Sequence, residues 1–193
     1  GARVVILNHP RWPSVAEGPH GVFALDRLYG ERHAGDVPFT FDAMELVNST
    51  TEDEAWDYVL RDWFALLNHG ERITAVGSSD SHTVGDPVGQ GRTYVASATD
   101  DPAAIDVEAA CDAFLAGRTS VSMGFFVDAG IGEQMGFLER EGIGDQGMGA
   151  TVSPDHDGPL ELRVRVAAAS WLPPEPLRVY ANGTLILEQP IRA

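Results

Sequence analysis

The sequence predicts an α/β region over residues 1–125, followed by a small antiparallel β-sandwich-like domain over residues 126–193. Three observations lead to this prediction. A short, wholly apolar segment at 4–7 is typical of a strand in a covered parallel sheet. Strand-like and helix-like segments then alternate up to residue 123. Over residues 160–166, apolar and polar residues alternate with a period of two, which is typical of antiparallel strands.

The α/β region is expected to contain two helices and four more strands. The first helix should run from capping residues at 49–51 to about Leu67, because apolar side chains recur at helical spacing and Gly70 follows as a stop signal. The second should cover 106–117 and carry the single cysteine, which excludes an internal disulfide. The further strands are expected at 41–47, 73–76, 92–96 and 118–123.

The end of the chain is expected to form a hairpin. Residues 177–181 and 184–188 read as strands, and Asn182-Gly183 lies between them. This dipeptide favours the type I′ turn, because both residues tolerate a positive φ. We therefore expect two antiparallel strands joined by a two-residue loop.

The composition excludes several functions. The chain has 29 acidic and 13 basic residues, for a net charge of −16, and every basic residue is Arg. Without lysine there is no Schiff-base, phosphate-loop or general-base lysine. The acidic balance argues against nucleic acid and anionic membrane surfaces as partners. A substrate anion would have to be held by Arg, by backbone N–H groups or by a metal ion.

Polar residues follow three of the predicted strands. His9 follows the first strand, Glu45 and Asn48 lie at the end of the second, and Asp80 and His82 follow the third. The C-terminal ends of parallel strands form the functional face of α/β folds. A carboxylate with imidazoles is an ordinary ligand set for Zn²⁺, Mn²⁺ or Fe²⁺, which can acidify a bound water. The spacing therefore predicts a metal site at this edge.

Each of these residues also has a plain structural interpretation. Asp80 and His82 could form a hydrogen-bonded pair within a loop, His9 before a proline could be structural, and Glu45 could pair with an arginine. The other histidines are expected in solvated positions: His20, His33, His69 and His156.

Several segments resemble the polymerase-and-histidinol-phosphatase (PHP) superfamily of metal-dependent phosphoesterases and hydrolases. Its carbaryl-hydrolase-like branch (CehA/McbA) is the most similar. The most specific segment is Gly-Ser-Ser-Asp-Ser-His at 77–82. The resemblance covers residues 3–125 well and the remainder loosely. The other matching segments lie at 4–11, 41–48, 63–70, 91–95 and 116–119.

The resemblance implies that residues 1–125 are the C-terminal half of a distorted (β/α)₇, TIM-like barrel with a metal centre at its strand ends. It implies divalent Zn, Mn or Fe ions and hydrolysis of a small phosphate ester or a carbamate or ester by metal-activated water. The implied metal residues are Asp80, His82, His9 and Asn48. The implied catalytic residues are His9, Arg11 and Glu45, with Arg11 holding a substrate anion.

One departure from the family pattern changes these expectations. The family's opening His-x-His is absent from the chain, and Gly1 leads almost directly into a buried strand. We therefore expect a chain truncated at its N-terminus, which lacks part of the metal site and has impaired activity. An incomplete barrel would expose strand edges, which favours self-association into a homo-oligomer.

Two alternatives to a metal-dependent hydrolase stay open. The chain could be a non-catalytic, degenerate half-barrel whose β-sandwich-like domain binds a glycan or a protein. It could also use Ser79 or Ser81 as a nucleophile, although the Gly-x-Ser-x-Gly elbow of such hydrolases is absent.

Overall fold

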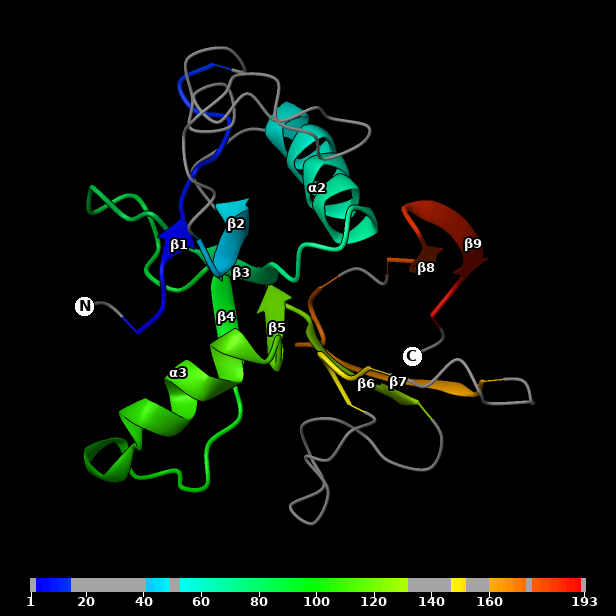
Figure 1. Cartoon of the computed structure of the whole chain (residues 1–193). Coiled ribbons are helices and arrows are strands. Elements are labelled where there is room, and N and C mark those ends of the chain that lie inside the picture. The colour runs from blue at the N-terminus through cyan, green and yellow to red at the C-terminus, as the bar shows by residue number, and fades with distance from the viewer. Residues whose placement is uncertain are drawn as a thin grey trace.

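The first strands form a three-stranded parallel sheet with the order β1-β2-β3 (Figure 1). The computed structural model describes residues 3–14, 41–48, 53–131, 147–151, 160–172 and 175–191, without the side chains of 53–57. The three strands are β1 (Ile6–Leu7), β2 (Ala43–Asn48) and β3 (Thr74–Ser78). All six residues of β2 are buried. The central strand is therefore covered on both faces, whereas β1, which the sequence predicts to be covered, leaves Ile6 40% exposed.

Helix α2 (Asp53–Asn68) covers one face of this sheet. Its Val59 and Leu66 join Met44 in a core cluster of buried apolar side chains. The helix ends at Asn68, close to the predicted Leu67, and the predicted stop residue Gly70 has a φ of 94°. The Gly70 N–H bonds the Leu67 carbonyl, and the Glu71 N–H bonds the Leu66 carbonyl. This is a Schellman C-cap, which requires a residue with positive φ.

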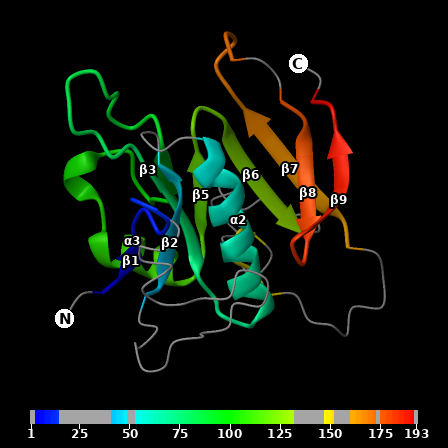
Figure 2. The same cartoon turned by 90° about the horizontal axis from the view of Figure 1, so that it is seen from above.

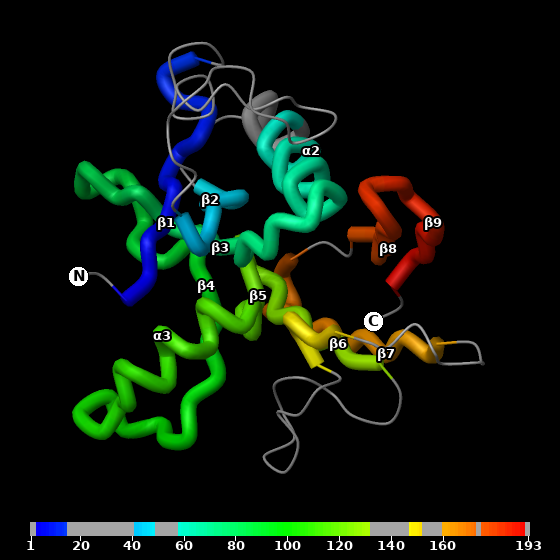
Figure 3. Tube along the Cα trace, viewed as in Figure 1, coloured from blue at the N-terminus to red at the C-terminus, as the bar shows by residue number. Residues whose placement is uncertain are grey.

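The strands that follow β3 do not extend the parallel sheet. β4 (Arg92–Val95) and β5 (Thr119–Ser122) pair antiparallel with each other. A short 3₁₀ turn, η1 (Pro102–Ala104), and helix α3 (Val107–Leu115) connect them, so that β5 returns beside β3 (Figure 3). Asp106 caps α3 by accepting a hydrogen bond from the Ala109 N–H. Both predicted helices are thus confirmed.

The prediction of half a (β/α)₇ or TIM-like barrel is wrong. Among the described residues, the parallel sheet stops after three strands, two α-helices are present and no barrel closes. The reason lies at the outer edge of β3. Thr93 Oγ1 accepts from the Gly77 N–H and donates to the Gly77 carbonyl, both at 2.8 Å. A β4 side chain therefore satisfies backbone groups that a further parallel strand would use.

The described part of the C-terminal region consists of two separate two-stranded sheets. β6 (Phe126–Ile131) pairs with β7 (Leu162–Ala167), and β8 (Leu177–Ala181) pairs with β9 (Thr184–Gln189). The predicted hairpin is confirmed, because Asn182 and Gly183 both have a positive φ, of 50° and 77°. In Figure 2 the two pairs lie to the right of α2, away from β1 and α3. These sheets replace the single sandwich-like unit expected from the sequence.

The two regions touch across the expected boundary near residue 125. The rings of Tyr94 and Phe126 lie 5.0 Å apart, and those of Phe64 and Tyr180 lie 5.4 Å apart. Ser120 Oγ donates to the Val127 carbonyl at 2.8 Å. The division into 1–125 and 126–193 stays a prediction. In the described part of the chain, neither α-helix combines the length and apolar character needed to cross a membrane.

Candidate functional site

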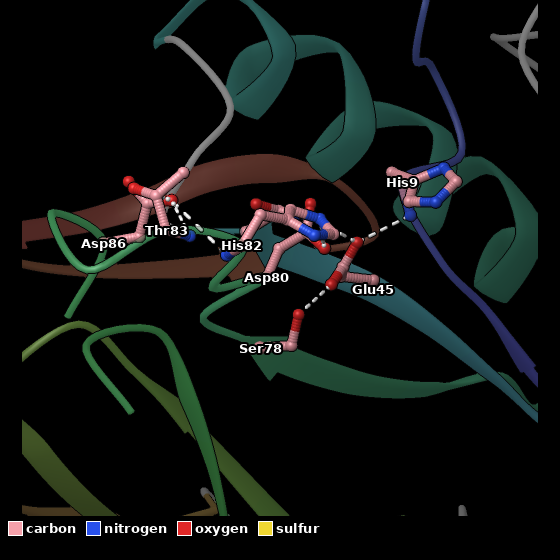
Figure 4. Close-up of polar contacts among 8 residues, drawn as sticks. His9, Glu45, Ser78, Asp80, His82, Thr83 and Asp86 are labelled. Carbon is pink, nitrogen blue, oxygen red and sulfur yellow. Dashed lines mark hydrogen bonds and ion pairs between the residues drawn. The ribbon is translucent and has the colours of Figure 1, made fainter. Parts of the chain in front are cut away.

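The C-terminal ends of the three parallel strands bring the predicted site residues together (Figure 4). His9 lies just after β1, Glu45 and Asn48 belong to β2, and Asp80 lies just after β3. Parallel strands end at the same edge of a sheet, so residues far apart in sequence meet there. The five residues predicted from strand ends form one line of polar contacts: His9, Glu45, Asn48, Asp80 and His82.

Glu45 is the buried centre of this edge and is only 3% exposed. Its Oε2 accepts from the His9 main-chain N–H at 2.6 Å and from Asn48 Nδ2 at 3.3 Å. Its Oε1 accepts from the Ser78 hydroxyl. A buried carboxylate is tolerated when donors surround it in this way. Glu45 therefore connects the ends of β1, β2 and β3.

Asp80 and His82 form the outer part of the site. Asn48 Nδ2 also donates to Asp80 Oδ2 at 3.2 Å, so the Asn48 amide bridges the two carboxylates. Asp80 Oδ1 lies 2.9 Å from His82 Nε2. The side chains of Asp80 and His82 are 31% and 74% exposed. The site thus runs from a buried carboxylate to an imidazole in solvent.

Two site residues have unusual backbone conformations. His9 has a φ of 33° and Asp80 a φ of 47°. Residues other than glycine rarely adopt a positive φ, although Asp and His do so more often than most. Such conformations cost about 1–3 kcal/mol each and persist only where the surroundings impose them. Both residues are therefore held in place by the contacts of this edge.

The His9 ring is half-buried beside an exposed aromatic side chain. Its centroid lies 5.6 Å from that of Trp12, which is 60% exposed. The Nδ1 atom of His9 is buried and has no hydrogen-bond partner among the described residues. Buried polar atoms are usually paired, so this nitrogen is an exception among the described side chains.

Arg11 does not lie in this line of contacts. Its guanidinium is bound by Asp62 of α2, with Nε to Oδ2 and Nη2 to Oδ1 both at 2.5 Å. The two side chains are 5% and 1% exposed. The group that was predicted to hold a substrate anion is thus engaged by a buried carboxylate instead.

The loop after Asp80 is fixed by a tight turn. Asp86 Oδ2 accepts from the Thr83 hydroxyl at 3.1 Å, from the Thr83 N–H at 3.0 Å and from the His82 N–H at 3.3 Å. These bonds lower the pKa of Asp86 below its ordinary value, and the bond from the Thr83 hydroxyl has the largest effect. They also hold the backbone that carries His82.

The donor types fit a divalent ion, but their arrangement supplies few ligands. Carboxylate and imidazole suit Zn²⁺ or Mn²⁺. In the described ranges, however, no group of three or more His, Cys, Asp or Glu side chains is placed to hold a metal ion. The metal centre expected from the resemblance therefore stays a prediction, with Asp80 and His82 as its candidate ligands. Asp80 and His82 remain as a solvent-accessible pair that fits a weakly held ion.

Comparisons with known proteins add no assignment: no protein-family model, no curated protein and no solved structure matches the chain. Two important residues were not singled out by the sequence. Ser78 binds Glu45, and Asp62 binds Arg11. Asp62 had a visible signal, because it occupies the same helix face as Val59 and Leu66. A charged residue on an apolar stripe indicates a buried partner. His20, His33 and His156 lie outside the described residues.

Proposed function

We propose that this chain is a metal-dependent hydrolase of the PHP type, with a reduced metal site at the C-terminal edge of its parallel sheet. The supporting observation is the continuous line of contacts from His9 through Glu45 and Asn48 to Asp80 and His82. The substrate class is a small phosphate ester or a carbamate or ester. The resemblance over residues 3–125 suggests this chemistry.

Asp80 and His82 are the residues that would hold the ion. They are exposed enough to exchange their mutual contact for a shared cation. A bound Zn²⁺ or Mn²⁺ supplies a water of lowered pKa and a charge that polarises a phosphoryl or carbonyl oxygen. Two protein ligands are fewer than the three of ordinary catalytic zinc sites, so we expect weak affinity.

The remaining residues orient this pair. Asn48 fixes the Asp80 carboxylate through the bond to Oδ2, and Glu45 holds Asn48 in turn. Glu45 is a positioning residue here, because three donors already engage its oxygens. His9 joins this line through its main-chain N–H, while its ring packs against Trp12. With Arg11 committed to Asp62, the ion would compensate the charge of a substrate anion.

Metal titration of the whole chain tests this proposal. Isothermal titration with MnCl₂ and ZnCl₂ should show one equivalent bound, and Asp80→Asn or His82→Gln should weaken binding at least about tenfold. The matched controls are Asp100→Asn and His69→Gln, both at exposed positions. Hydrolysis of p-nitrophenyl phosphate and p-nitrophenyl acetate should depend on the same two residues. Equal affinity in the site variants and the controls would refute the metal site.

A non-catalytic binding role is the second candidate, and one observation favours it. A groove of about 770 Å³ lies between β7 and the β8–β9 hairpin. Apolar side chains line it, among them Leu162, Val164, Val179 and Leu187. A groove of this kind fits an apolar segment of another protein better than a glycan. Metal-dependent hydrolysis by the unmodified chain would exclude a purely non-catalytic role.

A further inference from the structure

The turn that follows β1 is anchored to α2 by a buried ion pair. The guanidinium of Arg11 binds both carboxylate oxygens of Asp62, 51 residues away. The Arg11 guanidinium carbon also lies 5.8 Å from the centre of the Tyr58 ring, one helical turn before Asp62. A two-pronged contact between a planar guanidinium and a carboxylate fixes orientation as well as distance. The position of Arg11 is therefore set by α2.

The anchored turn carries His9. The Trp12 N–H donates to the His9 carbonyl at 3.0 Å, which closes a turn with Arg11 inside it. His9, with its φ of 33°, opens this turn. Its N–H is bound by Glu45 on the sheet side. The unfavourable conformation of His9 is thus held from two sides, by β2 and by α2.

We propose that Asp62 is a positioning residue for His9, acting through Arg11. The ion pair would keep the turn in the form in which the His9 N–H meets Glu45 and the His9 ring packs against Trp12. A buried ion pair seldom adds stability over apolar side chains of similar size. Replacing the pair should therefore change the geometry of the turn rather than the stability of the fold. This inference rests on the proposed function only in placing His9 in the site.

The test distinguishes an effect on the position of His9 from an effect on the stability of the whole chain. In Arg11→Met/Asp62→Leu, apolar side chains replace both charges, so the thermal unfolding midpoint should stay near that of the unmodified chain. The readouts are hydrogen exchange of the His9 amide and the ¹³Cα and ¹³Cβ shifts of His9, which report its φ. We expect His9 exchange to accelerate at least about tenfold and both shifts to move, while amides of β2 and β3 keep their protection.

If Arg11→Met/Asp62→Leu does not fold, a second variant tests the same inference. Arg11→Lys retains the charge but lacks the planar fork that fixes orientation, and should produce the same His9 changes to a smaller degree. Unchanged His9 exchange and shifts in either folded variant would overturn the inference. Metal binding is not a readout here. A chain that binds no metal but shows the His9 changes refutes the proposed function and supports the positioning role of Asp62.

Discussion

The main-chain N–H of His9 donates a 2.6 Å hydrogen bond to Oε2 of Glu45, 36 residues further along the chain. The same carboxylate binds the Ser78 hydroxyl through its other oxygen. The buried Glu45 side chain of β2 thus contacts His9, which follows β1, and Ser78, the last residue of β3. The geometry of the candidate site and the stability of the parallel sheet therefore depend on the same group.

Replacement of Glu45 by alanine should destabilise the protein. The His9 N–H, the Asn48 amide and the Ser78 hydroxyl would lose an acceptor at a buried position. Leaving buried donors unpaired costs about 1–3 kcal/mol per group, so we expect a loss of at least that size in urea unfolding. Glu161→Ala is the matched control, because Glu161 is 66% exposed and should change stability by less than about 0.5 kcal/mol. Equal losses in the two variants would contradict the role of Glu45.

A methyl group at Gly77 should disturb the junction of β3 with β4 and β5. A Cβ at this position would lie 2.8 Å from Val121 Cγ1 and 3.0 Å from the Arg92 carbonyl oxygen. Overpacking of this kind costs about 1–3 kcal/mol, so Gly77→Ala should lower the urea midpoint. Gly85→Ala should have little effect, because its Cβ would meet only Thr83 Oγ1 at 3.6 Å.

The double variant Gly77→Ala/Val121→Ala tests the cause of that loss. Removing the Val121 methyl groups relieves the shorter of the two contacts. The combined loss should then be smaller than the sum of the two single losses, as for residues in direct contact. Strict additivity would show that Gly77 is needed for another reason.

The apolar face of α2 can be tested with two adjacent leucines. Leu66 is 1% exposed and belongs to the core cluster, whereas Leu67 is 37% exposed. Leu66→Ala should cost about 2–5 kcal/mol through lost burial and a residual cavity. Leu67→Ala should cost clearly less in the same urea titration. A reversed order would show that the helix is rotated about its axis.

The Asp86 turn makes a prediction about pH. The lowered pKa of Asp86 means that its carboxylate is stabilised in the folded chain. Its contribution should be present above an ordinary pKa of 3.8, and should be lost as the pH falls through the lower, folded value. Thr83→Val removes the hydroxyl bond, the first cause of the lowered value, and should raise the pKa of Asp86. A ¹³C NMR titration of the Asp86 carboxyl measures this change, with Thr99→Val as the control. The same pKa in both variants would contradict the hydrogen-bond explanation.

Features that depend on neighbouring residues could be predicted from the sequence. The Gly70 stop and the Asn182-Gly183 hairpin form where the pattern placed them, and α3 ends at Leu115, two residues before the predicted end at 117. The assembly of His9, Glu45 and Asp80 also followed from the sequence, because residues at the ends of adjacent parallel strands must share an edge. Local backbone preferences and strand periodicity act over a few residues, so the sequence alone predicts the features that depend on them.

Contacts between distant segments were decided only by the tertiary structure. The segments at β4 and β5 were correctly predicted as strands, but they pair antiparallel with each other instead of extending a barrel. Arg11 was expected to face a substrate, and Asp62 of α2 binds it instead. Strand partners and ion pairs depend on which groups approach after the chain folds back over tens of residues. Periodicity and composition do not show which distant groups will meet. Burial and hydrogen-bond geometry in the folded chain show it directly.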